Sequence, residues 1–454
     1  MEMDGHAWAQ QQWGTCALGD RRLTARAVQV GQALVRQPEA SLPVQLGHPS
    51  ALRGAYRLLS NPRISGAQLW QPHLAATRQA ASEHAVVLLV QDRTTLDFSH
   101  HPATQGLGPV GLHHHQRGCL LHSVVAVLPE SQQVLGLVHS QVLVRPEAAA
   151  GPKPYGRRRT SAEGQAWEAA VRGVGVPPAG VTWVHVSDRE SDIYEYLVAC
   201  REMQTQFVVR AYQDRRVADP GSANARLLEQ VRAWSPASGA EATYTVTVAA
   251  TKTTPKRQAS VVVQWGAFTL PSPNHLRPAS QLALWCVRAW EPAPPLGAEA
   301  IEWILLTSWP VLTVTDARQV LRWYECRWLI EDYHQCLKTG CRIEASQLDQ
   351  LADLQRLLGF LAPLAVRLLQ LRQFARHQSD QLATQVVDPR WVRLLAHHYA
   401  LSPTTLTAQA FFLAVARLGG HQGRKRDGPP GWRTLWKGWR LLSEWAYGAS
   451  FPET

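Results

Sequence analysis

Two kinds of hydrophobic pattern follow each other along the chain. Residues 1–80 and 350–445 carry apolar positions at helical spacing, which predicts mostly helices. The region between them contains short apolar runs rich in β-branched residues, and such runs predict buried strands. These runs lie at residues 84–92, 119–127, 134–144, 182–188, 206–211 and 303–309. Helical patterns at 161–172 and 193–203 alternate with the strands, and this order predicts an α/β fold.

Four other segments refine this outline. Capping signals and helical spacing predict N-terminal helices at about 20–35 and 50–59. Residues 214–300 alternate polar and apolar positions between Thr, Pro and Gly residues, which predicts a β-rich insertion. Residues 316–339 then predict one long helix.

The charge is concentrated at the two ends of the chain. The net charge is +11, from 46 Lys and Arg against 35 Asp and Glu. Residues 1–80 carry +4 and residues 366–454 carry +7, whereas the middle holds 26 basic and 26 acidic residues. A basic excess of this kind favours an anionic partner, either nucleic acid or a membrane surface.

Membrane and disulfide classes fit the sequence poorly. The longest apolar run, 357–371, is interrupted by Arg367 and falls short of the roughly 18 residues of a membrane span. The first residues lack the pattern of a signal peptide. The seven cysteines form no CxxC pair, which argues against structural zinc or a disulfide framework and fits a reducing cytoplasm. Six histidines occur at 100, 101, 113, 114, 115 and 122, and an exposed loop is favoured over a zinc site for them.

Three acidic residues are candidates for chemistry. Asp92 and Asp188 each follow an apolar strand pattern, and ligands of open α/β sheets bind at the carboxyl ends of strands. Glu331 lies on the predicted long helix. If the three carboxylates meet, they form an oxygen site of the kind that Mg²⁺ prefers, able to support in-line attack on a phosphodiester. The alternative for each aspartate is a turn or cap residue.

The long helix presents further polar residues on the side of Glu331. At 100° per residue, Tyr324, Arg327, Glu331 and Lys338 fall within an arc of roughly 60°. Arg327 and Lys338 beside an acid could bind substrate phosphates. The alternative is a surface ladder of salt bridges, since Arg327 and Glu331 are four residues apart.

The motifs together resemble those of cut-and-paste DDE transposases, in particular the insertion-sequence-four family, whose prototype is the Tn-five transposase. The resemblance is carried by DRTTLDFSH at 92–100, VSDRESDIYEYL at 186–197, FVVRA at 207–211, WILLTS at 303–308 and Y-x2-R-x3-E-x6-K at 324–338. It extends to both ends, through WAQQQWGTCALGDRRLTAR, GAYRLLSNPRIS, LLQLR, ARLGG and GWRTLWKGW.

The resemblance implies three domains. A helical DNA-binding domain would span residues 1–75, and a helical dimerisation domain would span 366–454. Between them, an RNase H-like catalytic core would occupy 76–365 and contain the β-rich insertion at about 214–300.

The resemblance also implies roles for particular residues. Asp92, Asp188 and Glu331 would be the catalytic acids that bind Mg²⁺, with Mn²⁺ as a substitute. Tyr324, Arg327 and Lys338 would contact phosphates near the cleaved end, Trp303 would stack on a flipped base, and Arg210 would lie near a DNA hairpin. Without the resemblance, Trp303 would be interpreted as a core aromatic. The charge pattern adds four arginines on the predicted N-terminal helices as DNA contacts, namely Arg21, Arg22, Arg26 and Arg57.

The implied activity is excision and insertion of a DNA element. Water frees a 3′ hydroxyl, this hydroxyl forms a hairpin on the opposite strand, water opens the hairpin, and the 3′ end joins target DNA. The partners would be double-stranded DNA, as terminal repeats and target, and a second copy of the chain, in the bacterial cytoplasm at the nucleoid and not at a membrane. Two alternatives are a catalytically silent DNA-binding relative and a stand-alone nuclease. The intact acids argue against the first, and the basic ends argue against the second.

Overall fold

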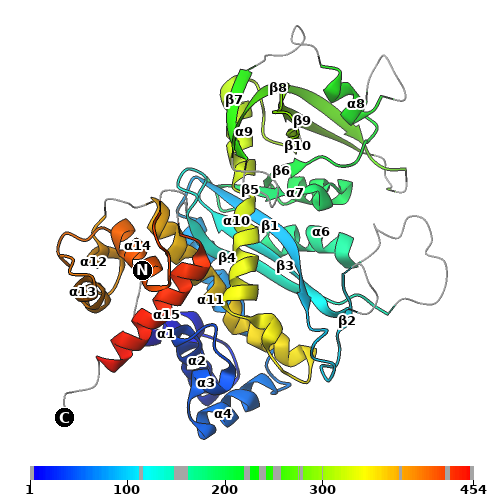
Figure 1. Cartoon of the computed structure of the whole chain (residues 1–454). Coiled ribbons are helices and arrows are strands. Elements are labelled where there is room, and N and C mark those ends of the chain that lie inside the picture. Colours follow the sequence, from blue (N-terminus) through cyan, green and yellow to red (C-terminus); the bar gives the residue numbers. More distant parts are fainter. Residues whose placement is uncertain are drawn as a thin grey trace.

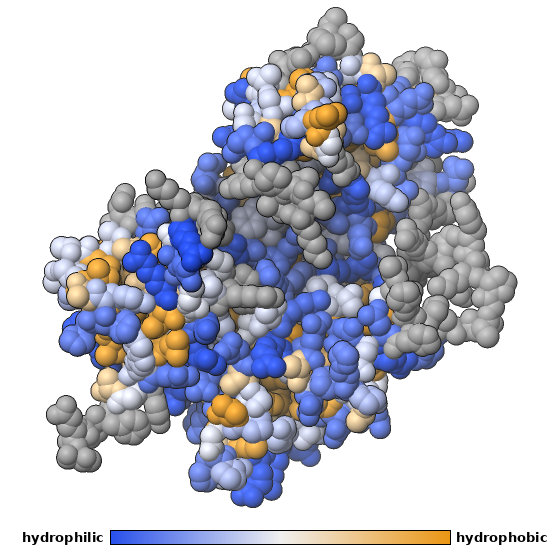
Figure 2. All heavy atoms as spheres, viewed as in Figure 1, coloured by the Kyte–Doolittle hydropathy of each residue, from blue (hydrophilic) through white to orange (hydrophobic). Residues whose placement is uncertain are grey.

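A computed structural model describes residues 5–111, 116–147, 162–218, 225–234, 242–248, 257–274, 276, 280–298, 300–377, 381–424 and 430–449. A central sheet carries helices on its faces, with N-terminal helices packed at one side and C-terminal helices at another (Figure 1). The face seen in Figure 2 is mostly hydrophilic, and its hydrophobic residues occur in several small groups.

Within the described part of the chain, ten strands form one sheet of order β2-β3-β1-β5-β6-β10-β9-β8-β7, with β4 also paired to β3. The strands are β1 (Val86–Asp97), β2 (Gly108–Pro109), β3 (Arg117–Val127), β4 (Val134–Leu143), β5 (Thr182–Ser187), β6 (Gln206–Arg210), β7 (Ala242–Val248), β8 (Arg257–Pro271), β9 (Gln281–Trp290) and β10 (Glu302–Thr307). The mixed sheet with flanking helices is the RNase H-like α/β fold that the sequence predicted.

The β-rich segment is continuous with the core sheet. Strands β4, β3 and β1 are antiparallel neighbours, and β5 and β6 then run parallel to β1. Strand β10 pairs with β6 on one edge and with β9 on the other. Because β9, β8 and β7 follow in antiparallel order, the insertion extends the sheet and does not form a separate layer. A short helix, α8 (Leu227–Arg232), precedes β7.

Alternate residues of β1 pack on opposite faces of the sheet, as expected for a strand buried on both sides. Leu88 and Val90 belong to the large core cluster that includes residues of α9 (Val314–Glu325), α10 (Trp328–Gln335) and α11 (Leu351–His377). Val87 and Leu89 belong to a smaller cluster with Ala170 and other residues of α6 (Ala162–Val174). Helix α7 (Tyr194–Glu202) follows β5 and contacts α6.

The N-terminal region is helical, as predicted. Its helices are α1 (Gly5–Trp13), α2 (Arg21–Arg36), α3 (Leu42–Leu46), α4 (Pro49–Leu59) and α5 (Gly66–Ala81). Asp20 caps α2, because its side chain accepts a hydrogen bond from the backbone N–H of Arg22. Trp13 attaches this region to the rest of the protein: its indole is buried, donates to the carbonyl of Gly359 at 3.3 Å and packs against Phe360.

The C-terminal region begins with the longest helix. Helix α11 (Leu351–His377) is followed by α12 (Ala383–Val386), α13 (Pro389–His398), α14 (Ala408–Leu418) and α15 (Trp432–Gly448). By length and composition, Leu351–Gln373 could cross a membrane, but 89% of its apolar window is buried inside the protein. The apolar segment is therefore longer than the run at 357–371 that the sequence suggested. Its burial in the core explains its apolar composition.

The predicted helix at 316–339 is not one continuous helix, and this expectation was wrong. It divides into α9 (Val314–Glu325) and α10 (Trp328–Gln335), followed by a π-helical turn at Cys336–Gly340. At the junction the backbone N–H groups of Cys326 and Arg327 bond three residues back, which tightens the turn. The tight junction and the wide turn after it change the rotation per residue, so a uniform 100° no longer describes the segment.

Candidate active site and nucleic-acid interface

Asp92 and Asp188 lie where β1 and β5 stop pairing with each other. The parallel pairing ends at Val90 opposite Val186. Asp188 follows the last residue of β5, as predicted. Asp92 does not end its strand, because β1 continues along β3 as far as Asp97. The hairpin partner β3 thus supports β1 beyond the point where β5 leaves it, and Asp92 projects from a paired strand.

The two aspartates form an electrostatically coupled pair. The pKa of Asp92 is raised to about 7. Burial is the larger cause, and the nearby charge of Asp188 is the second. Burial likewise raises the pKa of Asp188. The Asp92 carboxylate accepts a hydrogen bond from the backbone N–H of Arg93 at 2.7 Å, and Asp188 accepts one from Glu190 at 2.9 Å. These bonds only partly offset burial, so both pKa values stay above the usual value for an aspartate.

Glu331 is connected to the aspartates through one arginine. Arg327 lies 2.7 Å from the Glu331 carboxylate and 4.0 Å from that of Asp92. Its guanidinium is also 5.9 Å from the ring of Tyr324. Helix α10 packs against β1, and Arg327 at the start of this helix contacts both Glu331 and Asp92. Arg327 thus lies next to both Glu331 and Tyr324.

Lys338 does not lie on a continuous helical face with Tyr324, Arg327 and Glu331, as the sequence predicted. The π-helical turn carries Lys338 to Glu344, and the ammonium and carboxylate lie 3.4 Å apart. Glu344 also accepts the backbone N–H of Asp97 at the end of β1. Lys338 therefore lies next to the far end of the strand that carries Asp92, paired with an acid of its own.

Trp303 and Arg210 converge on Tyr324. The rings of Trp303 and Tyr324 are 5.5 Å apart and meet edge to face. Trp303 is half-buried on β10, so it is not a fully buried core aromatic. Arg210, on the neighbouring strand β6, donates to the carbonyl of Glu302 at 2.9 Å and lowers the pKa that burial raises at Tyr324. An indole, a phenol and two guanidiniums thus adjoin the carboxylates.

The four arginines predicted to bind DNA in the N-terminal region lie on α2 and α4. Arg21, Arg22 and Arg57 are exposed, whereas Arg26 is half-buried. A Cβ at Gly54 would stand 2.8 Å from the guanidinium carbon of Arg26, so this side chain rests on α4. Arg26 therefore contributes to the packing of the two helices, and the other three are open to a partner.

Two groups of side chains near the aspartates were missed by the sequence prediction. Arg93 forms ion pairs with Glu163 and Glu190, and its position after Asp92 is the only local signal for it. His122, predicted to lie in an exposed loop, is fully buried on β3, and that prediction was wrong. Its ring packs edge to face on Trp167 of α6, with centroids 4.6 Å apart.

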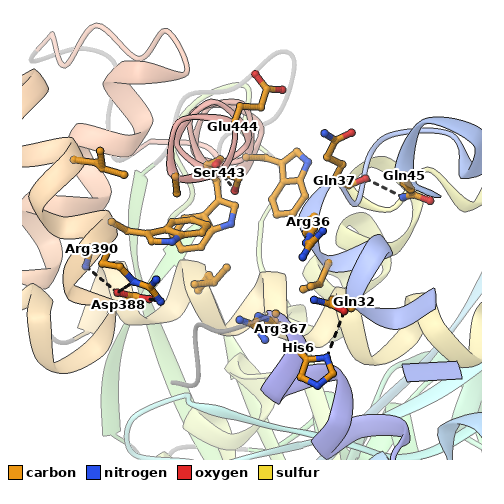
Figure 3. A pocket seen from close by; sticks show the side chains of 18 of the residues that line it. His6, Gln32, Arg36, Gln37, Gln45, Arg367, Asp388, Arg390, Ser443 and Glu444 are labelled. Atoms are coloured by element: carbon orange, nitrogen blue, oxygen red, sulfur yellow. Dashed lines mark hydrogen bonds and ion pairs between the residues drawn. The ribbon is translucent and has the colours of Figure 1, made fainter. Parts of the chain in front are cut away.

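A cavity of about 920 Å³ lies away from these carboxylates, between helices of the N-terminal and C-terminal regions. Figure 3 shows Arg36, Gln32 and His6 on one side of it and Arg390 with Asp388 on the other. Its lining contains none of the three predicted catalytic acids. The histidines at 113–115 lie outside the described residues.

The three acids have the chemistry that a divalent cation prefers, but their side chains are not gathered around one point. Among the described residues, no group of three His, Cys, Asp or Glu side chains is gathered closely enough to hold a metal ion. The two coupled carboxylates, and a third that shares an arginine with them, would offer oxygen donors alone. Such a set matches hard divalent cations rather than zinc or copper.

Parts of the chain match two family models. Residues 5–64 match a family model described as transposase DNA-binding, and residues 184–366 match one described as a transposase DDE domain. The second match contains Asp188 and Glu331. A solved structure of a piggyBac transposase synaptic complex with hairpin DNA is similar at 8% identity and a TM-score of 0.37, over 95% of this chain and 73% of that chain. DDE transposase domains use divalent metal ions. The chain carries the DNA-binding and DDE domains of a DNA transposase, and it is a DNA-cleaving and strand-transferring enzyme of the DDE class.

Proposed function

We propose that this enzyme is a cut-and-paste transposase of the insertion-sequence-four family, with Asp92, Asp188 and Glu331 as its catalytic acids. The observation that carries the proposal is the coupled pair Asp92 and Asp188 at the point where two parallel strands diverge, linked by Arg327 to Glu331. Buried carboxylates of like charge are unfavourable unless a cation is bound between them.

Mg²⁺ is the proposed cofactor, with Mn²⁺ as a substitute. Asp92, Asp188 and Glu331 would hold the metal, which supplies an activated oxygen nucleophile and stabilises the leaving oxygen. The raised pKa of Asp92 supports this role, because a bound cation would favour the ionised carboxylate that burial disfavours.

The cationic and aromatic side chains around the acids position DNA. Arg327 and Arg210 would bind phosphate oxygens beside the scissile bond, and Lys338 would bind the backbone further along. Trp303, whose ring is half-exposed and supported by Tyr324, would stack on an extrahelical base. These contacts hold the substrate in line for attack, and positioning of this kind accounts for much of phosphoryl-transfer catalysis.

The proposed route passes through a hairpin. Water releases a 3′ hydroxyl at the element end, the hydroxyl attacks the opposite strand, a second water opens the hairpin, and the 3′ end joins target DNA. Residues 1–75 would bind terminal repeats, 76–365 would catalyse, and 366–454 would pair two copies at the ends of the element. The work would take place on DNA in a bacterial cytoplasm, at the nucleoid.

The test is an in vitro reaction with the terminal repeats that flank the coding region, in Mg²⁺. Excision, a hairpin on the excised element and joining to target DNA are expected. Asp188→Ala should abolish all three while leaving end binding intact, and Asp349→Ala, which removes an exposed acid elsewhere, should change none. Cleavage that persists in Asp188→Ala would contradict the assigned site. Cleavage without joining would favour a nuclease.

A further inference from the structure

A buried layer of polar side chains lies behind the two aspartates, on the other face of the sheet. Gln91 directly precedes Asp92 on β1, and Ser187 directly precedes Asp188 at the end of β5. Alternate residues of a strand face opposite sides, so Gln91 points away from the face that carries Asp92. Gln91 and Ser187 are both fully buried. Polar groups in such a position are costly unless they are hydrogen-bonded.

Gln91 uses the donors and the acceptor of its side chain. Its amide nitrogen donates to the Tyr196 hydroxyl at 2.7 Å and to Nδ1 of His185 at 3.0 Å. Its amide oxygen accepts from Nε2 of His122 at 3.2 Å. Burial lowers the pKa of His185 to about 3 and that of His122 well below its usual value. Both imidazoles are therefore neutral, and the glutamine contacts fix the proton of each on Nε2.

The chain of hydrogen bonds continues from Tyr196 to the backbone of Asp188. Ser191 donates its only hydroxyl proton to the Asp188 carbonyl at 2.8 Å. Because that proton is used, the 2.6 Å contact between Ser187 and Ser191 requires Ser187 to donate. Tyr196 must then donate across its 3.2 Å contact with Ser187. The direction runs from Gln91 through Tyr196, Ser187 and Ser191 to Asp188.

This chain begins where the sheet itself stops joining the two strands. The backbone pairing of β1 with β5 ends at Val90 and Val186, one residue before Gln91 and Ser187. Beyond that point the mutual repulsion of Asp92 and Asp188 acts to separate the strand ends. The side-chain link replaces the missing ladder bonds across the gap. Trp167 covers the layer, with its ring 6.1 Å from that of Tyr196.

We infer that Gln91 and Tyr196 are positioning residues for the acidic pair: the buried hydrogen-bond chain between them and Asp188 holds Asp92 and Asp188 at the spacing that a divalent cation requires. The inference rests on the proposed function, since it takes these two aspartates as the metal-binding pair. Groups that orient metal ligands from behind typically change metal affinity or activity by about 10–100-fold when they are removed. The consequence is a defect in metal affinity and not in DNA binding.

The test compares two tyrosines of α7. Tyr196→Phe removes one hydroxyl from the chain, and Tyr194→Phe is the matched control, because Tyr194 is equally buried on the same helix but its hydroxyl contacts Ser280 at 3.2 Å. Tyr196→Phe should raise the Mn²⁺ concentration for half-maximal cleavage roughly tenfold, and excess Mn²⁺ should restore the rate. Tyr194→Phe should leave the half-maximal concentration unchanged. Paramagnetic resonance of bound Mn²⁺ gives the affinity directly, and end binding should equal that of the unmodified enzyme.

A double substitution tests whether the residues act as one chain. Once the link is broken, a second break should add little, so Ser187→Ala with Tyr196→Phe should need no more metal than the worse single variant. If Tyr196→Phe does not fold, Ser191→Ala breaks the last bond of the chain, and the same rise in metal requirement is expected.

The inference is overturned if Tyr196→Phe and Tyr194→Phe show the same metal dependence, or if Ser187→Ala and Tyr196→Phe add independently. Failure of the proposed function has a different signature. In that case Asp188→Ala retains cleavage and Mn²⁺ binding whatever the tyrosine variants do. If the proposed function and the inference both hold, Asp188→Ala loses cleavage even in excess Mn²⁺. Excess Mn²⁺ then restores cleavage to Tyr196→Phe.

Discussion

The two faces of the sheet at the ends of β1 and β5 differ in how many hydrogen bonds their polar side chains make. On one face, Asp92 and Asp188 are half-buried with few partners, and their pKa values are raised. On the other, Gln91 is fully buried with hydrogen bonds to three side chains. Gln91 and Asp92 are neighbours on β1, yet one is fully hydrogen-bonded and the other is a carboxyl group with few partners. The two acids of like charge lie on the face proposed to accept a cation, and we infer that the hydrogen-bonded layer behind it limits how far they can separate.

The largest expected effect comes from removing charge on the acidic face. Asp92→Asn should lower cleavage at least about 10³-fold, on the scale of losing a central charge-stabilising group. The same change should raise the melting temperature of the metal-free protein, by about 2–4 °C for each kcal/mol of repulsion relieved. Single-turnover cleavage and thermal melting in a chelator measure the two effects. Loss of activity with lower stability would show that Asp92 stabilises the fold.

The neighbouring residue should show the reverse combination. Gln91→Met keeps the side-chain volume but leaves buried partners unsatisfied, which should destabilise the protein by roughly 1–3 kcal/mol. Cleavage at saturating metal should persist, since no acid is changed. Denaturant unfolding and metal titration of cleavage measure both properties. A Gln91→Met enzyme that stays inactive at high metal, although folded, would mean that the two faces are not separable in this way.

The pH dependence of metal binding sharpens the contrast. The pKa of Asp92 in the folded protein is about 7, so the carboxyl is protonated below that pH and must lose a proton to bind metal. Metal affinity should fall by roughly tenfold for each pH unit below 7 and level off above it. His185 and His122 are neutral over this range, so the opposite face should contribute no slope.

Stability should change with pH in the opposite sense. Because the folded-state pKa of Asp92 is raised from 3.8, its contribution to stability is fully present below pH 3.8 and is lost as the pH rises through about 7. The metal-free enzyme should therefore melt at a lower temperature at pH 8 than at pH 6, and Asp92→Asn should remove most of that difference. A difference that survives Asp92→Asn belongs to other groups.

The smallest effect is expected from a cation at the edge of the acidic face. Lys338→Ala should weaken end binding and reduce the slope of log affinity against log salt by about one unit, as for one lost phosphate contact. Arg172→Ala is the control, because Arg172 on α6 is paired with Glu168 of the same helix and with Glu202 of α7. An unchanged slope for Lys338→Ala would assign this side chain to Glu344 alone.

The acidic face could be predicted from sequence in most respects, and the opposite face could not. Asp188 follows a short apolar strand, and Arg327 and Glu331 are four residues apart, so local spacing was sufficient for both. The partners of Gln91 lie 31, 94 and 105 residues away in the chain. No local sequence pattern relates these partners. The sequence alone also does not distinguish the two buried histidines among them from exposed ones.

The errors along the chain have the same origin. Asp92 was placed at a strand end because the apolar run stops there, but β3 continues to pair with β1 through Asp97. The helix at 316–339 was treated as uniform because apolar spacing does not register a tight junction or a π-helical turn. In the first case a neighbouring strand set where the regular structure ended, and in the second a local change in backbone hydrogen bonding did.

The sequence by itself determined the α/β order of elements, the acids and cations proposed to carry the chemistry, and the basic ends of the chain. These depend on residue type and on spacing within a few residues, which the chain specifies locally. Only the tertiary structure decided that Asp92 and Asp188 share one site, that their pKa values rise, and that a hydrogen-bond chain lies behind them. Those properties depend on burial and on the distances between strands far apart in sequence, and both exist only once the sheet has formed.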